Sequence, residues 1–115
     1  MGRSGTVGAG EGDLDRTFEM LAHRYRRWLL MYMVEFDEEE IDLQRATRII
    51  GVLEPHSSSE SVATLLHHNH LRRLDGAGIV DYDAESGRIT FTGQTLVENL
   101  LRETADWDAR FAEMR

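Results

Sequence analysis

The chain has 115 residues, a formal net charge of −8 at pH 7, 41% hydrophobic residues and no cysteine. This length and apolar content are typical of one folded domain with a modest core. The lack of cysteine excludes disulfides, thiolate-bound metals, iron–sulfur clusters and thiol nucleophiles. No apolar run approaches the ~18 residues that span a membrane, and none at the start resembles a signal peptide, so we expect a cytoplasmic protein.

The charged residues have an unusual composition, because all 13 basic residues are arginines. An acidic chain without lysine indicates adaptation to a very salty cytoplasm, where charge repulsion is screened within about 3 Å at 1 M salt. The alternative is an ordinary acidic protein that has no lysine by chance. Net negative charge normally argues against a nucleic-acid partner. In molar salt this argument is weaker, because counterion release then contributes little to binding.

The first segment, residues 1–12, is rich in glycine and predicts a flexible tail. Asp13 can then cap a first helix. At helical spacing, three apolar side chains of this helix share one face and should meet the core: Leu14, Phe18 and Leu21.

A second helix follows, and it is apolar on every side from Trp28 to Val34, which predicts a buried central helix. The acidic stretch 37–40 is expected to be a solvated loop. Asp42 can cap a third helix, which Pro55 ends. The apolar face of this third helix contains Leu43, Ala46, Ile50 and Leu53.

A fourth helix is predicted from the capping-box spacing of Ser57 and Glu60 to about Asp75, where Gly76 and Gly78 end it. The alternating stretches "GIVDYD" and "GRITFT", joined by "AESG", then predict a β-hairpin.

Thr92 can cap a last helix over residues 93–114. Two helices followed by a hairpin are the arrangement of a winged helix-turn-helix, in which the hairpin is the wing. We therefore predict a mainly helical α+β fold, with a winged helix-turn-helix domain over residues 13–92. Residues 93–115 add a C-terminal helix.

The stretch "ATLLHHNHLRRLDGAGIVDYDAESGRITFT" resembles a family of haloarchaeal winged-helix domains of largely uncharacterised function. Their shared pattern is His-x-His-Leu-x-x-Leu, a small residue and Gly, a hydrophobic pair, Asp-Tyr-Asp and a turn Gly. The matching residues here are His68, His70, Leu71, Leu74, Gly78, Ile79, Val80, Asp81, Tyr82, Asp83 and Gly87. The resemblance covers roughly residues 13–92 and implies a winged helix with a role in transcription, but no known ligand. Arg72 departs from the pattern, because the family usually has Pro there.

Three histidines of the fourth helix raise the question of a metal site. Helical spacing places His70 in the middle of the apolar face, together with Val62, Ala63, Leu66 and Leu74. We predict that His70 is buried and hydrogen-bonded. His67 and His70 could instead supply two ligands to a metal in a sensor protein. Nothing in the sequence fixes a third ligand, so we predict neither a metal nor a cofactor.

The opposite face of the fourth helix carries the candidate DNA-reading residues: Ser61, Thr64, His68 and Arg72. Such a face can enter a major groove, where Arg72 could bind guanine or a phosphate. The alternatives are a solvated helix face or a surface for a partner protein, because Leu65 and Leu71 flank it.

Further arginines could contact the DNA backbone. Arg24, Arg26 and Arg27 cluster at the start of the second helix, where they could either approach phosphates or pair with the acidic loop. Arg88 lies beside the wing turn and could reach a phosphate or the minor groove. The wing should nevertheless bind weakly, because three acidic residues surround Arg88: Asp81, Asp83 and Glu85.

The last helix has apolar residues at alternating steps of three and four, which is typical of a helix–helix seam. Its candidate dimer-interface residues are Val97, Leu100, Trp107, Phe111 and Met114. A two-fold homodimer would present two reading helices to a pseudo-palindromic site. The alternative is that this helix folds onto its own domain.

Together these patterns predict a homodimeric, double-stranded-DNA-binding transcription regulator of a halophilic archaeal cytoplasm. The alternative is a protein–protein adaptor that has the winged fold without DNA binding. We expect no enzyme activity, because no Ser–His pair has a third group to orient it and no lysine is present for a Schiff base. No small-molecule substrate or membrane partner is evident.

Overall fold

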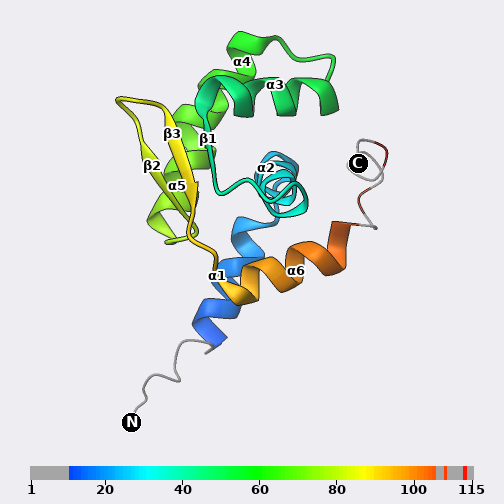
Figure 1. Ribbon diagram of the computed structural model, residues 1–115, viewed down its shortest axis with the longest axis vertical. Coiled ribbons are helices and arrows are strands. Elements are labelled where there is room, and N and C mark those ends of the chain that lie inside the picture. Colours follow the sequence, from blue (N-terminus) through cyan, green and yellow to red (C-terminus); the bar gives the residue numbers. More distant parts are fainter. Residues whose placement is uncertain (1–10, 106–107, 109–112, 114–115) are drawn as a thin grey trace.

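The computed structural model describes residues 11–105, 108 and 113 (Figure 1). The elements are α1 (Glu11–Met20), α2 (Arg24–Glu35), β1 (Glu40–Asp42), α3 (Leu43–Leu53), α4 (Ser59–Leu65), η2 (Leu66–His70), α5 (Leu71–Gly76), β2 (Val80–Asp83), β3 (Arg88–Phe91) and α6 (Thr95–Ala105). The strands form one antiparallel sheet in the order β1-β3-β2. This mainly helical α+β fold is winged-helix-like, as predicted. Most of the predicted flexible tail lies outside the described residues.

Helix α2 occupies the centre of the molecule, where Figure 1 shows it end-on between α3 and α4 above and α6 below. Its buried side chains are Tyr25, Arg26, Trp28, Leu29, Leu30, Met31, Met33 and Val34. The prediction of a buried central helix is confirmed. Because α2 has apolar side chains around its whole circumference, every other element can pack against it.

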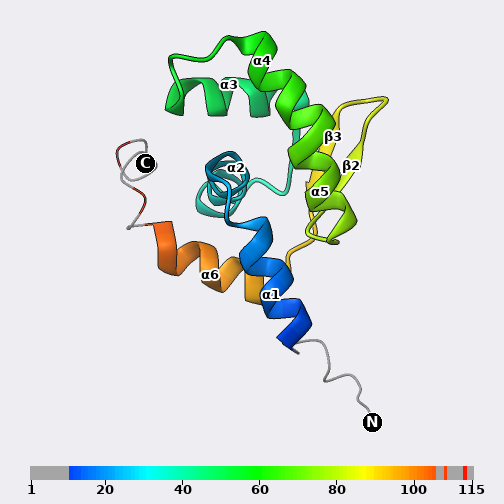
Figure 2. The ribbon, with the colours of Figure 1, turned by 180° about the vertical axis from the view of Figure 1, so that it is seen from behind.

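Helix α1 packs on the core differently from the prediction. Thr17, Met20 and Leu21 are buried, whereas Leu14 and Phe18 are 38% and 54% exposed. The helix extends away from the body of the molecule and meets it only near its C-terminal end (Figures 1 and 2). The prediction that Leu14 and Phe18 face the core was therefore wrong.

The acidic stretch after α2 is not entirely a loop, because its last residue begins β1. This short strand pairs with β3, with Ile41 opposite Ile89, and Ile41 is buried. The pairing is extended by the bonds from the N–H of Phe91 to the carbonyl of Glu39 and from the N–H of Leu43 to the carbonyl of Gly87. The strand thus fixes the start of α3 against the hairpin.

The predicted helix caps have different outcomes in the structure. Asp13 does not cap the first helix, because α1 begins at Glu11 and contains it. Asp42 caps α3 as predicted, since its carboxylate accepts the N–H of Arg45 at 2.8 Å. The cap of α4 is Ser58 rather than Ser57, and its hydroxyl accepts the N–H of Ser61 at 3.1 Å. The predicted capping box with Glu60 is therefore wrong by one residue.

The hairpin forms where it was predicted, with Tyr82 opposite Ile89 and a turn that ends at Gly87. Gly87 has a φ of 80°, a left-handed conformation that glycine adopts without steric cost. Thr92 does not cap the last helix. Its hydroxyl donates to the carbonyls of Gly78 and Ile79 instead, which fastens the end of β3 to the start of β2.

Helix α6 folds back onto α2 of its own chain. Val97, Leu101 and Ala105 are buried in the shared core, while Leu100 is half-buried. Val97 is 0% exposed and has no surface to offer a second subunit, so its assignment to a dimer interface was wrong. The remaining candidates lie outside the described residues: Trp107, Phe111 and Met114.

The predicted continuous helix over residues 93–114 is shorter in the structure. α6 ends at Ala105, and Asp108 is not helical. The carboxylate of Asp108 accepts a hydrogen bond from the indole N–H of Trp28 at 2.9 Å, which draws the chain back toward α2. Among the described residues, no helix is long and apolar enough to cross a bilayer.

Candidate nucleic-acid interface

The candidate site is built on one continuous helical rod, residues 59–76, which consists of α4, η2 and α5. The middle segment, η2, is a π-helical turn, in which the N–H of Leu71 bonds the carbonyl of Leu66. The rod runs beside the hairpin in Figure 2. Its buried inner side chains are Val62, Leu66, His70, Leu71 and Leu74. The predicted amphipathic rod and the burial of His70 are confirmed.

The outer face of the rod is open to solvent. Ser61, Thr64, His68 and Arg72 are all exposed, as are Asn69 and Arg73. Neither Arg72 nor Arg73 forms an ion pair with a carboxylate in the part of the chain that the structure describes. Leu65 is 44% exposed on this face. The structure thus brings the four predicted reading residues together along one accessible surface.

Behind this face, His70 bonds to a buried arginine. Its Nδ1 atom lies 3.1 Å from a terminal nitrogen of Arg26, which also donates to the carbonyls of Met20 and Glu19. Burial lowers the pKa of His70 to about 4, and the charges of His23, Arg26 and Arg73 add to this effect. The imidazole is therefore neutral at neutral pH, with Nδ1 as the acceptor for Arg26.

His67 joins the rod to the hairpin. Its Nδ1 atom lies 2.7 Å from the hydroxyl of Tyr82 on β2, and the two rings meet edge to face. The pKa of Tyr82 is raised, mainly by burial. His67 and His70 thus bond to different partners on different elements. Within the described residues, no three histidine or acidic side chains are placed to hold a metal ion.

The edge of the rod next to the hairpin is acidic. An open groove there is lined by Asp75, Asp81, Tyr82, Asp83, Arg88 and Thr90. Arg88 is exposed, but it pairs with Asp83 at 3.9 Å. Hydrogen bonds from Ser86 and the N–H of Glu85, together with the charge of Arg88, lower the pKa of Asp83. The carboxylate of Asp83 therefore stays ionised, and it would repel a phosphate near Arg88.

The arginines at the start of α2 have intramolecular partners. Arg24 donates to the carboxylate of Glu54 at 2.9 Å. Arg27 donates to the carbonyl of Leu21 at 2.8 Å and lies 3.7 Å from the carboxylate of Asp108. Neither pairs with the acidic stretch 37–40, whose Glu38 accepts from Arg45 instead. These contacts give Arg24 and Arg27 structural roles that the sequence did not predict.

Comparison with known families places the rod within a recognised domain. Residues 18–90 match the family model described as Domain of unknown function (DUF7344). The chain belongs to the DUF7344 family. No curated protein and no solved structure matches it.

The DUF7344 segment contains α2, the whole rod and nearly all of the sheet. Every residue predicted to contact DNA lies within it, whereas α6 lies outside. Two features of the site were not predicted: the buried position of Arg26 and the bond between His67 and Tyr82. Sequence patterns predict an exposed position for an arginine, so the burial of Arg26 had no signal. Tyr82 had one, because it occupies the inward position of an alternating strand, which predicts a contact with the rod.

Proposed function

We propose that this protein binds duplex DNA and regulates transcription, with the outer face of the rod in the major groove. The observation that carries this proposal is the exposure of Ser61, Thr64, His68 and Arg72 along one face whose opposite side is buried. A major groove about 12 Å wide admits one α-helix, and an arginine can bind a guanine there through two hydrogen bonds. Arg72 is the residue best suited to that contact, because it is exposed and forms no ion pair within the described part of the chain.

The proposal includes the cellular setting and the assembly. The arginine-only basic composition and the net charge of −8 support a haloarchaeal winged-helix protein that works in a salty cytoplasm. We also propose a homodimer that involves Leu100 and the residues after Ala105. Light scattering coupled to gel filtration in molar KCl tests the dimer directly, and a monomeric mass would contradict it.

Selection of bound sequences from a random duplex library, in molar KCl, tests DNA recognition. The wild-type chain should enrich a defined motif. Arg72→Ala should lose about 1–3 kcal/mol of preference at one position of that motif. Arg102→Ala is the matched control, because Arg102 is exposed on α6 and should leave the motif unchanged.

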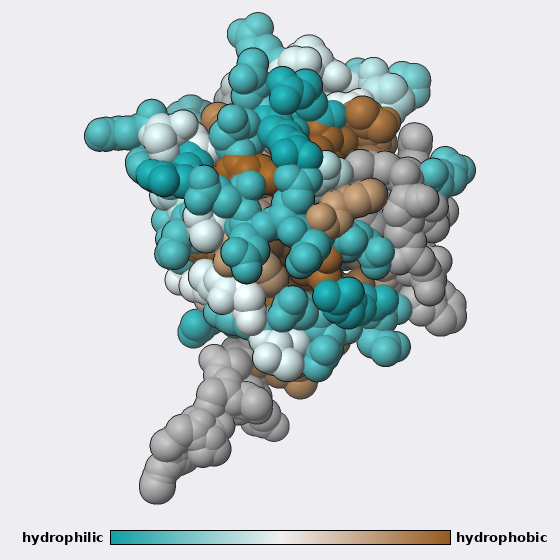
Figure 3. All heavy atoms as spheres, in the orientation of Figure 1, coloured by the Kyte–Doolittle hydropathy of each residue, from teal (hydrophilic) through white to brown (hydrophobic). Residues whose placement is uncertain are grey.

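Two results would contradict the proposal. One is the absence of any enriched duplex for a folded wild-type chain, and the other is an identical motif for Arg72→Ala. The first result would favour the adaptor function. Exposed Leu65, beside a shallow hollow lined by Ser58, Glu60, Ser61 and Thr64, supports that alternative. The surface seen in Figure 3 is mostly hydrophilic, with hydrophobic residues in separate small areas, which is a weaker basis for a protein partner.

A further inference from the structure

The two edges of the rod differ in charge. The hairpin edge carries Asp75, Asp81 and Asp83, and its arginine, Arg88, is paired with Asp83. The other edge, which faces the start of α2, carries Arg73 on the rod and Arg26 on α2. A DNA duplex that binds the rod would therefore meet a negative potential at the hairpin edge and a positive potential at the α2 edge.

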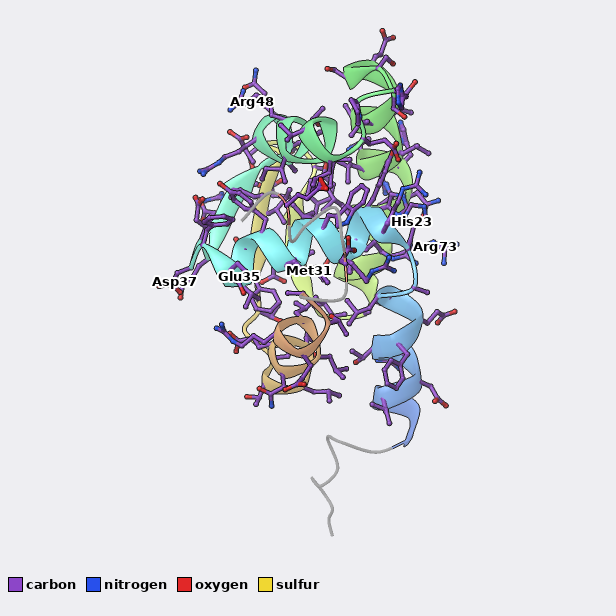
Figure 4. All side chains as sticks on the ribbon, turned by 90° about the vertical axis from the view of Figure 1, so that its right-hand side faces the viewer. His23, Met31, Glu35, Asp37, Arg48 and Arg73 are labelled. Atoms are coloured by element: carbon purple, nitrogen blue, oxygen red, sulfur yellow. The ribbon has the colours of Figure 1, made fainter. Side chains whose placement is uncertain are left out.

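Arg73 is the accessible cation of the α2 edge. It is exposed, and its Nε donates to the side-chain oxygen of Asn69 at 2.8 Å, which orients the guanidinium. In Figure 4, Arg73 and His23 lie on the same side of the molecule, near the first turn of α2. The ring of His23 lies 4.2 Å from that of His70, whose pKa is lowered mainly by burial and to a smaller extent by nearby charges, Arg73 among them. Arg73, His23, His70 and Arg26 therefore form one cluster.

The cluster has excess positive charge at its centre. Burial lowers the pKa of Arg26, the positive charge of Arg73 lowers it further, and the charge of Glu19 opposes these effects. Farther along the edge, Arg24 and Arg27 are compensated by Glu54 and Asp108. Among the residues that the structure describes, no carboxylate forms an ion pair with Arg73. Its terminal nitrogens are thus available for an anion from outside the chain.

We propose that the α2 edge of the rod, with Arg73 as its contact residue, binds a backbone phosphate of duplex DNA, whereas the hairpin stays off the duplex. This inference rests on the proposed function. Arg72 and Arg73 point about 100° apart around the helix. If Arg72 faces the floor of the groove, Arg73 faces the strand that forms its wall, where a guanidinium can bind a phosphate with two hydrogen bonds.

The test is the salt dependence of binding to a labelled random-sequence duplex, measured by fluorescence anisotropy over a KCl series. Arg73→Gln should reduce the magnitude of the slope of log K against log [KCl] by about 1 relative to wild type, because one phosphate contact is lost. Arg88→Gln is the matched control, since Arg88 is also exposed but lies on the hairpin edge, and its slope should equal that of wild type. Arg73→Lys, which keeps the charge, should keep the slope.

The outcomes separate this inference from the proposed function. A wild-type chain that binds no duplex overturns both. A wild-type chain that binds, with an unchanged slope for Arg73→Gln or a reduced slope for Arg88→Gln, overturns the phosphate site alone. Melting temperatures of all variants establish that they are folded. If Arg73→Gln fails to fold, Arg73→Glu and ethylation interference on the wild-type complex replace it, and ethylated phosphates that block binding must then lie on the α2 side of the rod.

Discussion

Arg26 and His70 form a polar contact inside the core, which links three helices at one point. Arg26 lies on α2. Its guanidinium donates to the last carbonyls of α1 and to the imidazole of His70 on the rod. A buried arginine needs hydrogen bonds for its N–H groups, because an unpaired buried charge costs several kcal/mol. The contact therefore fixes the position of the rod relative to α1 and α2, and it requires a neutral His70.

The lowered pKa of His70 makes stability depend on pH. In the unfolded chain a histidine has a pKa of about 6.5, so between that value and about 4 the unfolded state binds more protons than the folded one. The stability contributed by neutral His70 is thus complete above about pH 6.5 and is lost as the pH falls toward about 4. We expect a loss of about 2 kcal/mol between pH ~7 and ~5, measured by urea unfolding.

His70→Gln provides the control for this prediction. Glutamine can still accept a hydrogen bond from Arg26 but does not titrate, so its stability should fall less over the same pH range. In NMR spectra of the wild-type chain, the imidazole signal of His70 should not shift between these pH values. A titration of that signal near the ordinary histidine pKa would contradict the assignment.

At the scale of elements, local signals were sufficient for the hairpin, α2 and the cap of α3, because each depends on residues close in sequence. Helical spacing also predicted the exposed residues of the rod's outer face, but it placed Leu71 beside this face, whereas Leu71 is buried. β1 was missed because its short stretch contains one apolar residue, Ile41, between two acids, and its extended form depends on the backbone of β3. The contact between Arg26 and His70 joins distant segments, and no local pattern indicates it. The alternation of β2 marks Tyr82 as inward-facing, but it does not identify His67 as the partner.

The cap of α4 can be tested with two neighbouring serines. Ser58→Ala should lower the free energy of unfolding by about 1 kcal/mol, because the N–H of Ser61 loses its acceptor. Ser57→Ala is the control, since Ser57 does not cap the helix, and should change it by less than about 0.5 kcal/mol. Urea unfolding of both variants measures the difference. A larger effect for Ser57→Ala would restore the capping box that the sequence suggested.

At the scale of the whole molecule, α6 completes the core by covering α2. We expect Leu101→Ala to destabilise the fold by about 2–5 kcal/mol, because Leu101 is 1% exposed and its removal leaves a cavity. Leu65→Ala makes the same chemical change at a 44% exposed position and should cost less than about 0.5 kcal/mol. Thermal or urea unfolding gives both values. Equal effects would mean that α6 does not belong to the cooperative unit.

The hydrophobic face predicted for the last helix thus packs in part against α2 of the same chain. The spacing of apolar residues identifies a hydrophobic face but not the surface that covers it, because packing on a second subunit and packing on the chain's own α2 require the same pattern. Val97 shows this ambiguity, because its burial against α2 could only be established in three dimensions.

The family match stops before α6 begins. In a chain that had only the equivalent of residues 18–90, the hydrophobic side of α2 that contacts Val97, Leu101 and Ala105 here would be exposed to solvent. Such a relative would have to supply a different cover for this surface, from its own flanking sequence or from another molecule. In this chain α6 supplies that cover, so a segment outside the matched residues completes the core of the segment inside them.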